Sequence, residues 1–244
     1  MGRWKRVLTI ALIVLGPGMV IYFLATHLKN KFIELPYLGQ WTYTTDSTGK
    51  ITDSTAFTIP DFSLTRLDGK IINRDSIRGK FIVLSTLQPD CPNFESCGMG
   101  MYHFNEIFFR KLVKNQDNYA NVKVLTVLTD LEGNPLPDSA SSQIKEEMEA
   151  YDSDIWWTTF GDPTPLFSWE YYGENFMTYE SDPKLGEVGR YAFINSLVLI
   201  DDKGHIRGVS GAKKDSDIRN FFDLLKLLKK EEFDRKWEEE HPED

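Results

Sequence analysis

The chain has 244 residues, a hydrophobic content of 41% and a formal net charge of −9. Residues 1–29 hold four lysines and arginines and no acidic residue, so the rest of the chain carries a formal charge of −13. This charge argues against nucleic acid as a partner, because nucleic-acid binding needs clustered cations, and it suits cationic proteins or metal ions better. Two cysteines are too few for a disulfide-stapled miniprotein, and the length suffices for one ordinary core.

Residues 7–25 form an uncharged and largely apolar run near the N-terminus. At a helical rise of about 1.5 Å per residue, this run covers nearly the whole of a hydrocarbon core about 30 Å thick. A cleaved signal peptide is the alternative, but neither a small-x-small cleavage site nor a lipobox cysteine follows the run. We therefore expect a retained transmembrane anchor over residues 1–28, with the large domain on the extracytoplasmic (periplasmic) side.

Residues 29–56 are polar and rich in threonine, serine and aspartate, and they predict a stalk between the anchor and the domain. The turn signal Ser47–Lys50 allows a β-hairpin within this stalk, formed by Trp41–Thr44 and Ile51–Thr55.

Residues 57–230 are expected to form a single domain in which strands and helices alternate, followed by a charged tail over residues 231–244. The runs Phe81–Leu87 and Val122–Leu128 are apolar enough to be central strands that are covered on both faces. The order of elements predicts an α/β, thioredoxin-like fold with an N-terminal strand extension. The other expected elements are strands at Ile59–Leu64, Ile71–Ile72 and Trp156–Phe160, helices over Met99–Val113, Ser141–Tyr151 and Ser216–Lys230, and a β-hairpin of Leu197–Ile200 with Ile206–Val209.

Cys91 and Cys97 are the two cysteines of the chain, and both follow the expected strand Phe81–Leu87. Because open α/β sheets place their chemistry at the carboxyl ends of strands, the two thiols are the candidate catalytic pair and the candidate metal ligands. Five residues separate them, unlike the two-residue spacing of an ordinary redox helix. A structural disulfide, or two reduced thiols without chemistry, is the alternative.

Several short motifs occur in an order that resembles the Sco/SenC family over roughly residues 57–230. They are Ile59–Leu64, Asp68–Lys70, Cys91-Pro92 after a strand, Val127–Asp130, Trp157 before Gly161-Asp162, and Leu199–Asp201 before Gly204. Proteins of that family are membrane-tethered, thioredoxin-fold factors that bind copper and help to build the copper centre of cytochrome c oxidase. The resemblance implies the same fold, and it implies a respiratory oxidase subunit or another thiol-bearing protein as the client.

Two departures from the family pattern concern the copper ligands. The family has three residues between its cysteines and a proline after each, whereas here five residues intervene and Gly98 follows the second cysteine. The family's histidine ligand corresponds to Phe193 of this chain. Two thiolates can hold Cu(I), but Cu(II) prefers additional imidazole nitrogen, so we expect Cu(I) as the bound ion and poor binding of Cu(II).

The four histidines are scattered and form no metal-binding cluster. His103 lies six positions after Cys97, which on a continuous helix would leave the two residues about 240° apart, so we expect His103 to face elsewhere. His205, in the turn of the expected hairpin, and His241, in the tail, are expected to be solvated.

Two other groups of residues have ordinary structural interpretations. Asp130 and Asp138 could form a carboxylate pair, but the family resemblance implies strand-end and turn residues, and Pro135 and Pro137 support a loop. The aromatic-rich stretch from Trp156 to Tyr172 is expected to pack in the core and on the surface, with a partner-docking patch as the alternative.

Three functions are compatible with the sequence. The first, which we favour, is membrane-tethered handling of Cu(I) or of cysteine thiols in the biogenesis of respiratory cytochrome oxidase. The second is a thiol-disulfide oxidoreductase of the cell envelope, which needs an accessible thiol with a low pKa. The third is a non-catalytic, thioredoxin-like binding domain. The sequence leaves enzymatic activity undecided between them.

Overall fold

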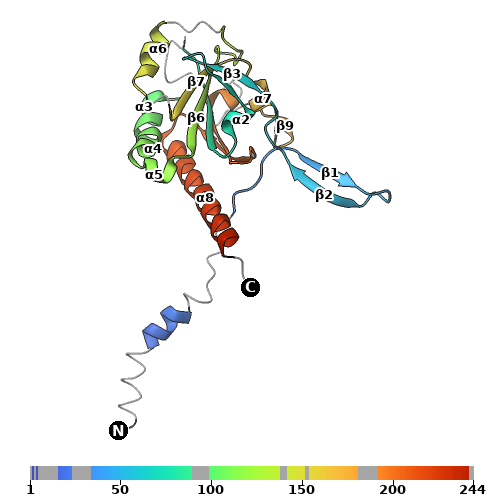
Figure 1. Cartoon of the computed structure of the whole chain (residues 1–244), viewed down its shortest axis with the longest axis vertical. Helices are drawn as coiled ribbons and strands as arrows, with labels where there is room; N and C mark the ends of the chain where they lie inside the picture. The colour runs from blue at the N-terminus through green and yellow to red at the C-terminus, as the bar shows by residue number, and fades with distance from the viewer. Residues whose placement is uncertain are drawn as a thin grey trace. The chain divides into compact units, whose positions relative to one another are not determined.

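The computed structural model of the chain describes residues 2, 4, 16–23, 34–89, 99–137, 142–151, 154–180 and 192–241 (Figure 1). The chain divides into two compact units, Met1–Glu34 and Leu35–Asp244. In the first unit, residues 16–23 are helical. Within the described ranges, no helix is both long enough and apolar enough to cross a bilayer. The anchor over residues 1–28 therefore stays a prediction.

A mixed β-sheet forms the centre of the second unit, and β5, β6 and β7 are parallel within it. The antiparallel hairpin of β10 and β11 extends the sheet on one side, and the pair of β3 and β4 extends it on the other. This mixed α/β arrangement is consistent with the expected thioredoxin-like fold. In spatial order the described strands of the sheet are β11 (Ile206–Gly211), β10 (Ser196–Ile200), β5 (Phe81–Leu87), β6 (Val122–Leu128), β7 (Trp156–Phe160), β3 (Ser63–Arg66) and β4 (Ile71–Asn73).

Helices cover both faces of this sheet, which explains why β5 and β6 are mostly apolar and buried along nearly their whole length. The helices α3, α4, α6 and α8 pack on one face, and α2 and α7 pack on the other (Figure 1). The helical elements are α2 (Arg74–Ile77), α3 (Met101–Phe104), the π-helix η1 (Asn105–Phe109), α4 (Arg110–Lys114), α5 (Gln116–Tyr119), α6 (Ser142–Glu149), α7 (Thr164–Phe167), the 3-10 helix η3 (Ala192–Asn195) and α8 (Asp215–Glu240).

Two further pairs of short strands lie outside the central sheet. β1 (Trp41–Thr45) and β2 (Ile51–Ala56) form the hairpin that the turn signal allowed, and this hairpin projects from the domain (Figure 1). The Asp46 carboxylate accepts hydrogen bonds from the backbone N–H groups of Thr48 and Lys50, which fixes the turn between the strands. β8 (Glu170–Tyr171) pairs with β9 (Glu174–Asn175) in a second small hairpin.

The sequence misplaced two element boundaries. The strand expected at Ile59–Leu64 begins only at Ser63, since Pro60 lacks the N–H group that a strand residue donates. The last helix continues beyond Lys230 to Glu240. Its charged end is held by ion pairs, with Glu232 accepting from two lysines of the same helix and Arg235 bonding Asp202 at 2.6 Å.

An ionic cluster around Arg207 ties the first residues of the second unit to the rest of the domain. The Arg207 side chain is 5% exposed, and it bonds Asp201 at 3.2 Å and Glu231 at 2.7 Å. It also donates to the carbonyl oxygen of Leu35 at 2.7 Å, and its guanidinium lies 4.2 Å from the centre of the Tyr37 ring. Residues 35–37 are therefore part of the folded domain.

Candidate functional site

The carboxyl ends of β5 and β6 lie side by side, because the two strands are parallel and in register from Phe81 with Val122 to Leu87 with Leu128. β10 runs antiparallel to β5, so its first residues, preceded by η3, lie at the same edge of the sheet. The chain leaves β5 through Gln88 and Pro89 and then enters residues 90–98. Cys91 and Cys97, the candidate catalytic residues and metal ligands, lie outside the described residues, and their pairing and geometry stay predictions.

Gln88 is the centre of a buried polar cluster at this edge, and it is 5% exposed. Its Nε2 donates to Thr86 Oγ1 at 2.9 Å and to Thr129 Oγ1 at 2.8 Å, which links the ends of β5 and β6. Thr86 Oγ1 in turn donates to the carbonyl oxygen of Ile194 in η3 at 2.9 Å. Gln88 Oε1 accepts no hydrogen bond from any residue in the described part of the chain. The cluster fixes three converging segments against one another, three residues before Cys91.

Phe193, at the position of the family's histidine, is part of the hydrophobic core. Its side chain is 1% exposed, and its ring centre lies 5.2 Å from that of Phe167. Gly133 closes the other side, since a Cβ atom on this glycine would come within 2.3 Å of Phe193 Cζ. Gly133 also has a φ of 88°, which few residues other than glycine adopt. A packed phenyl ring offers no nitrogen, so this position does not fit a copper ligand.

The segment that follows the cysteines is hydrogen-bonded to the same edge. The N–H group of Gly100 donates to the carbonyl oxygen of Ala212 at 3.1 Å, and the N–H group of Ala212 donates to that of Asn195 at 2.8 Å. Met99, just before Gly100, is buried. These contacts connect the start of α3, the end of β11 and η3.

His103 lies in α3 and pairs with Asp215 in the first turn of α8. Its Nδ1 is 2.7 Å from Asp215 Oδ1, and both side chains are about half exposed. The helix begins at Met101 in the structure, so the helical-wheel argument that related His103 to Cys97 does not apply. The imidazole does face α8, and among the described residues no group of three or more histidine, cysteine, aspartate or glutamate side chains could hold a metal ion.

The prediction that His205 is solvated was wrong. The side chain is half-buried, its Nδ1 lies 2.9 Å from the carbonyl oxygen of Phe57, and its ring meets the edge of Tyr37 at 5.1 Å. The physical reason is that Leu38 and Thr58 form bridges to Ile206 and His205, which cover the β10–β11 turn. His241 is exposed as expected, with its ring stacked on Trp237 at 4.0 Å.

Asp130 has the structural role that the sequence indicated. Its carboxylate accepts hydrogen bonds from the backbone N–H groups of Glu132 and Asn134 and from the Asn134 side chain. Burial raises the pKa of Asp130, but these hydrogen bonds outweigh burial and hold the pKa below its usual value. Asp138, the other member of the suspected carboxylate pair, lies outside the described residues.

The aromatic-rich stretch is mostly core, as expected. Its three tryptophans, Trp156, Trp157 and Trp169, are all buried. Tyr171 packs edge-on against Trp169, and burial, followed by the neighbouring Tyr172, raises the pKa of Tyr171 to about 12. Tyr172 differs, because it is 82% exposed and has a φ of 51°.

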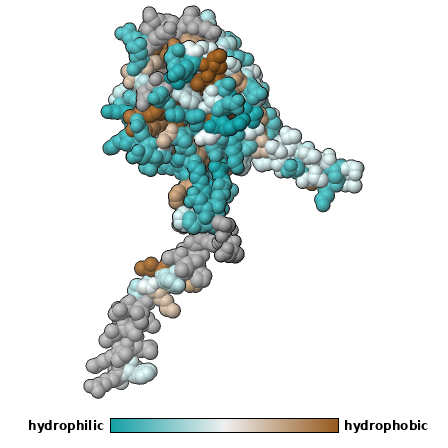
Figure 2. Space-filling view, in the orientation of Figure 1, coloured by the Kyte–Doolittle hydropathy of each residue, from teal (hydrophilic) through white to brown (hydrophobic). Residues whose placement is uncertain are grey.

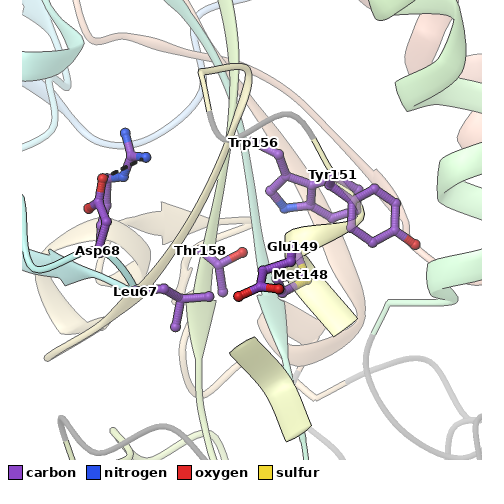
Figure 3. A pocket seen from close by; sticks show the side chains of 8 residues that line it. Leu67, Asp68, Met148, Glu149, Tyr151, Trp156 and Thr158 are labelled. Carbon is purple, nitrogen blue, oxygen red and sulfur yellow. Dashed lines mark ion pairs between the residues drawn. The ribbon is translucent and has the colours of Figure 1, made fainter. Parts of the chain in front are cut away.

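A cavity of about 360 Å³ lies between β7, β3 and the end of α6 (Figure 3). Leu67, Met148, Tyr151 and Trp156 supply its apolar wall, and the ion pair of Arg66 with Asp68 lies at its rim. None of its lining residues belongs to the edge that carries Gln88 and Phe193. The cavity is thus separate from the candidate cysteine site.

Comparison with known proteins identifies the fold. No protein-family model matches the sequence, and no curated protein matches it. The chain is similar to the solved structure of BsSco, a member of the Sco family of cytochrome c oxidase assembly proteins, with 15% identity, coverage of 71% of this chain and 94% of that chain, and a TM-score of 0.50.

Two other solved structures show weaker similarity. A SCO1/SenC family lipoprotein from Bacillus anthracis has 20% identity, with 70% of this chain and 95% of that chain covered and a TM-score of 0.45. ScoI from Bradyrhizobium japonicum, solved with copper bound, has 19% identity, with 70% and 100% covered and a TM-score of 0.43. The likeness to BsSco confirms the family resemblance at the level of the fold: the chain has a Sco-like α/β fold.

Proposed function

We propose that the chain is a divergent Sco-like protein that handles Cu(I), cysteine thiols, or both, through Cys91 and Cys97 in the biogenesis of respiratory cytochrome oxidase. The observation that supports the proposal is that β5 ends at the sheet edge where the Gln88 cluster and η3 converge, and that Cys91 follows Gln88 by three residues in the sequence. The similar fold of BsSco, whose family is described as cytochrome c oxidase assembly proteins, supports it.

The two proposed ligands, the thiolates of Cys91 and Cys97, favour Cu(I) over Cu(II). Cys91 and Cys97 would hold the ion, because thiolates are soft ligands and Cu(I) accepts low coordination. Cu(II) prefers additional imidazole nitrogen, and Phe193 is packed in the core at the position where the family has its histidine. The bound ion would supply soft Lewis-acid chemistry and a transferable cargo.

The test is competition for Cu(I) between the reduced full chain and a chromophoric chelator. We expect one Cu(I) per chain, and we expect Cys91→Ser and Cys97→Ser each to abolish tight binding. If wild type does not bind Cu(I) but interconverts between dithiol and disulfide with a protein client, the oxidoreductase function replaces the copper function. If it does neither, the chain is a binding domain.

The two cysteines are also proposed to form an intramolecular disulfide. Closure needs their Cα atoms to come within about 4.4–6.8 Å, which the intervening segment allows if it folds back. Such a short closed loop adds little stability through chain entropy. Thiol labelling before and after mild oxidation tests the pairing, and two labelled thiols after oxidation, or intermolecular dimers alone, would count against it.

The membrane tether is part of the same proposal. Residues 1–28 would form the anchor, and the thioredoxin-like domain would lie on the extracytoplasmic side; the expected stalk (29–56) and tail (231–244) are shorter than the sequence indicated, because residues 35–37 and α8 up to Glu240 belong to the domain. The apolar run over residues 7–25 supports the anchor. Alkaline washing of membranes should leave the full chain in the membrane fraction. Recovery of a soluble form that starts near residue 26–30 would contradict the anchor.

A further inference from the structure

The hairpin of β1 and β2 has two chemically different faces. Strand pairing places Trp41 opposite Ala56, Tyr43 opposite Ser54 and Thr44 opposite Asp53, and the register shifts between Thr44 and Thr45. Because side chains alternate along the regular part of each strand, Trp41, Tyr43, Ser54 and Ala56 share one face, and Thr42, Thr44, Asp53 and Thr55 share the other. One face therefore carries the two aromatic rings, and the other consists mainly of threonine.

The aromatic face is exposed in the isolated chain. Trp41 is 42% exposed and Tyr43 57%. Tyr37 continues this surface toward the domain, since its ring meets that of Trp41 edge-on at 6.2 Å. In Figure 2 the projecting hairpin is mostly pale, whereas the visible surface of the domain is mostly teal. A two-stranded hairpin is marginally stable by itself in water, so an exposed apolar face of this kind favours contact with another apolar phase or surface.

The charge of the hairpin indicates whether the aromatic face binds a cationic protein or a membrane surface. Residues 35–58 hold two aspartates and one lysine, although the chain after residue 29 is strongly acidic. A docking surface for a cationic protein would use the acidic part of the molecule, not its nearly neutral arm. Tryptophan and tyrosine on a neutral background are instead the side chains that accumulate at a membrane–water interface, where the ring is buried and its polar group stays wet.

The length of the chain keeps the hairpin within reach of a membrane. Fifteen residues, 26–40, separate the end of the apolar run from Trp41. A fully extended chain of this length spans about 50 Å at most, so the hairpin cannot move further than this from the bilayer that holds residues 7–25. This step rests on the membrane tether of the proposed function.

We propose that the face formed by Trp41 and Tyr43 lies in the interfacial region of the lipid bilayer, as a second and non-covalent contact between the domain and the membrane. Such a contact would limit the orientations of the domain relative to the bilayer. The face contributes through apolar burial and not through charge, so the contact should be insensitive to salt.

The test uses the full chain in phosphatidylcholine vesicles with brominated or ordinary acyl chains, since bromine quenches nearby tryptophan emission. In a Trp41→Phe background, Tyr43→Trp places the added indole on the aromatic face, and Thr44→Trp places it on the opposite face. Both positions are exposed, so neither change should disturb folding. We expect brominated lipid to abolish the added emission at position 43 and to leave that at position 44, with and without about 1 M salt.

Each alternative result has a distinct meaning. Equal quenching at both positions, or quenching at neither, would overturn the inference. If the chain also stays in the vesicles after an alkaline wash, the membrane tether is unaffected by that result. Loss of quenching at high salt would show a contact with charged headgroups and would also overturn it. Absence of quenching together with cross-linked dimers through the hairpin would assign the face to a second copy. A chain that alkali removes from the vesicles would contradict both the tether and the inference.

Discussion

Replacing Phe193 with histidine tests both the packing and the donor set of the sheet edge. The phenyl ring is buried against Phe167 and Gly133, and its burial is worth about 1.5–3 kcal/mol. An imidazole in the same place keeps part of that contact but introduces a polar N–H group into an apolar cluster, at about 1–3 kcal/mol if it has no partner. We expect Phe193→His to lower the free energy of unfolding by about 2–4 kcal/mol.

Urea unfolding of the full chain in mild detergent, followed by tryptophan emission, measures this loss. Phe193→Leu is the matched control, because an apolar replacement should cost less than about 1.5 kcal/mol if the polar group dominates the effect. Adding Cu(II) should then raise the unfolding midpoint of Phe193→His more than that of wild type, provided that both sulfurs point toward position 193. A loss below about 1 kcal/mol for Phe193→His would refute the argument that the site is apolar and closed.

Three further changes have expected outcomes. Gln88→Met removes two buried hydrogen bonds at nearly constant volume, and we expect a loss of about 1–3 kcal/mol in urea unfolding. Arg207→Met leaves the Asp201 carboxylate buried without its cation, and we expect it to lower the free energy of unfolding by about 3–5 kcal/mol in the same assay. A small loss would show that the ion pair is dispensable. Burial raises the pKa of Glu232, but hydrogen bonds from two lysines outweigh burial and hold the pKa below its usual value. The ionised carboxylate therefore stabilises the folded state at pH values above its unfolded pKa, and this stability is lost as the pH falls through the folded pKa. We expect the urea midpoints of wild type and Glu232→Gln to differ at pH 6 and to converge at acidic pH.

The central elements could be predicted from the sequence because their signals are local. β5 and β6 are mostly apolar runs, and their observed bounds are those that the runs indicated. The β10–β11 hairpin follows from two apolar runs around an Asp-Asp-Lys-Gly turn, and its strands begin or end within two residues of the expected positions. The pattern of α6 placed Ile144 and Met148 on one face, and both are buried.

The features that were missed depend on contacts between distant segments. The π-helix η1 lies inside a helix that the 3.6-residue period predicted as regular, and it buries the consecutive residues Ile107, Phe108 and Phe109. The half-buried state of His205 depends on Tyr37 and Phe57, which lie far away in the sequence. The continuation of α8 depends partly on the bond between Arg235 and Asp202. Periodicity within one segment contains no information on such partners.

The candidate site shows the same division between local and distant information. The sequence indicated the cysteines and the edge of the sheet, since both follow from the strand that ends at Leu87. It also indicated that Phe193 replaces a histidine, but not that Gly133 and Phe167 enclose the ring. The role of Gln88 was missed, because the two threonines that bind its amide are identified as neighbours only once the parallel pairing of β5 with β6 is known.

The closed environment of Phe193 has a consequence for the proposed function. A site with an imidazole ligand keeps one donor when its two thiols are oxidised, whereas this edge would keep none, because Phe193 is packed in the core. Oxidation of Cys91 and Cys97 to a disulfide removes two electrons and two protons and, with them, both soft ligands. Under the proposed function, copper binding and disulfide formation are therefore mutually exclusive states of one pair, and the chain could hold Cu(I) only while both thiols are reduced.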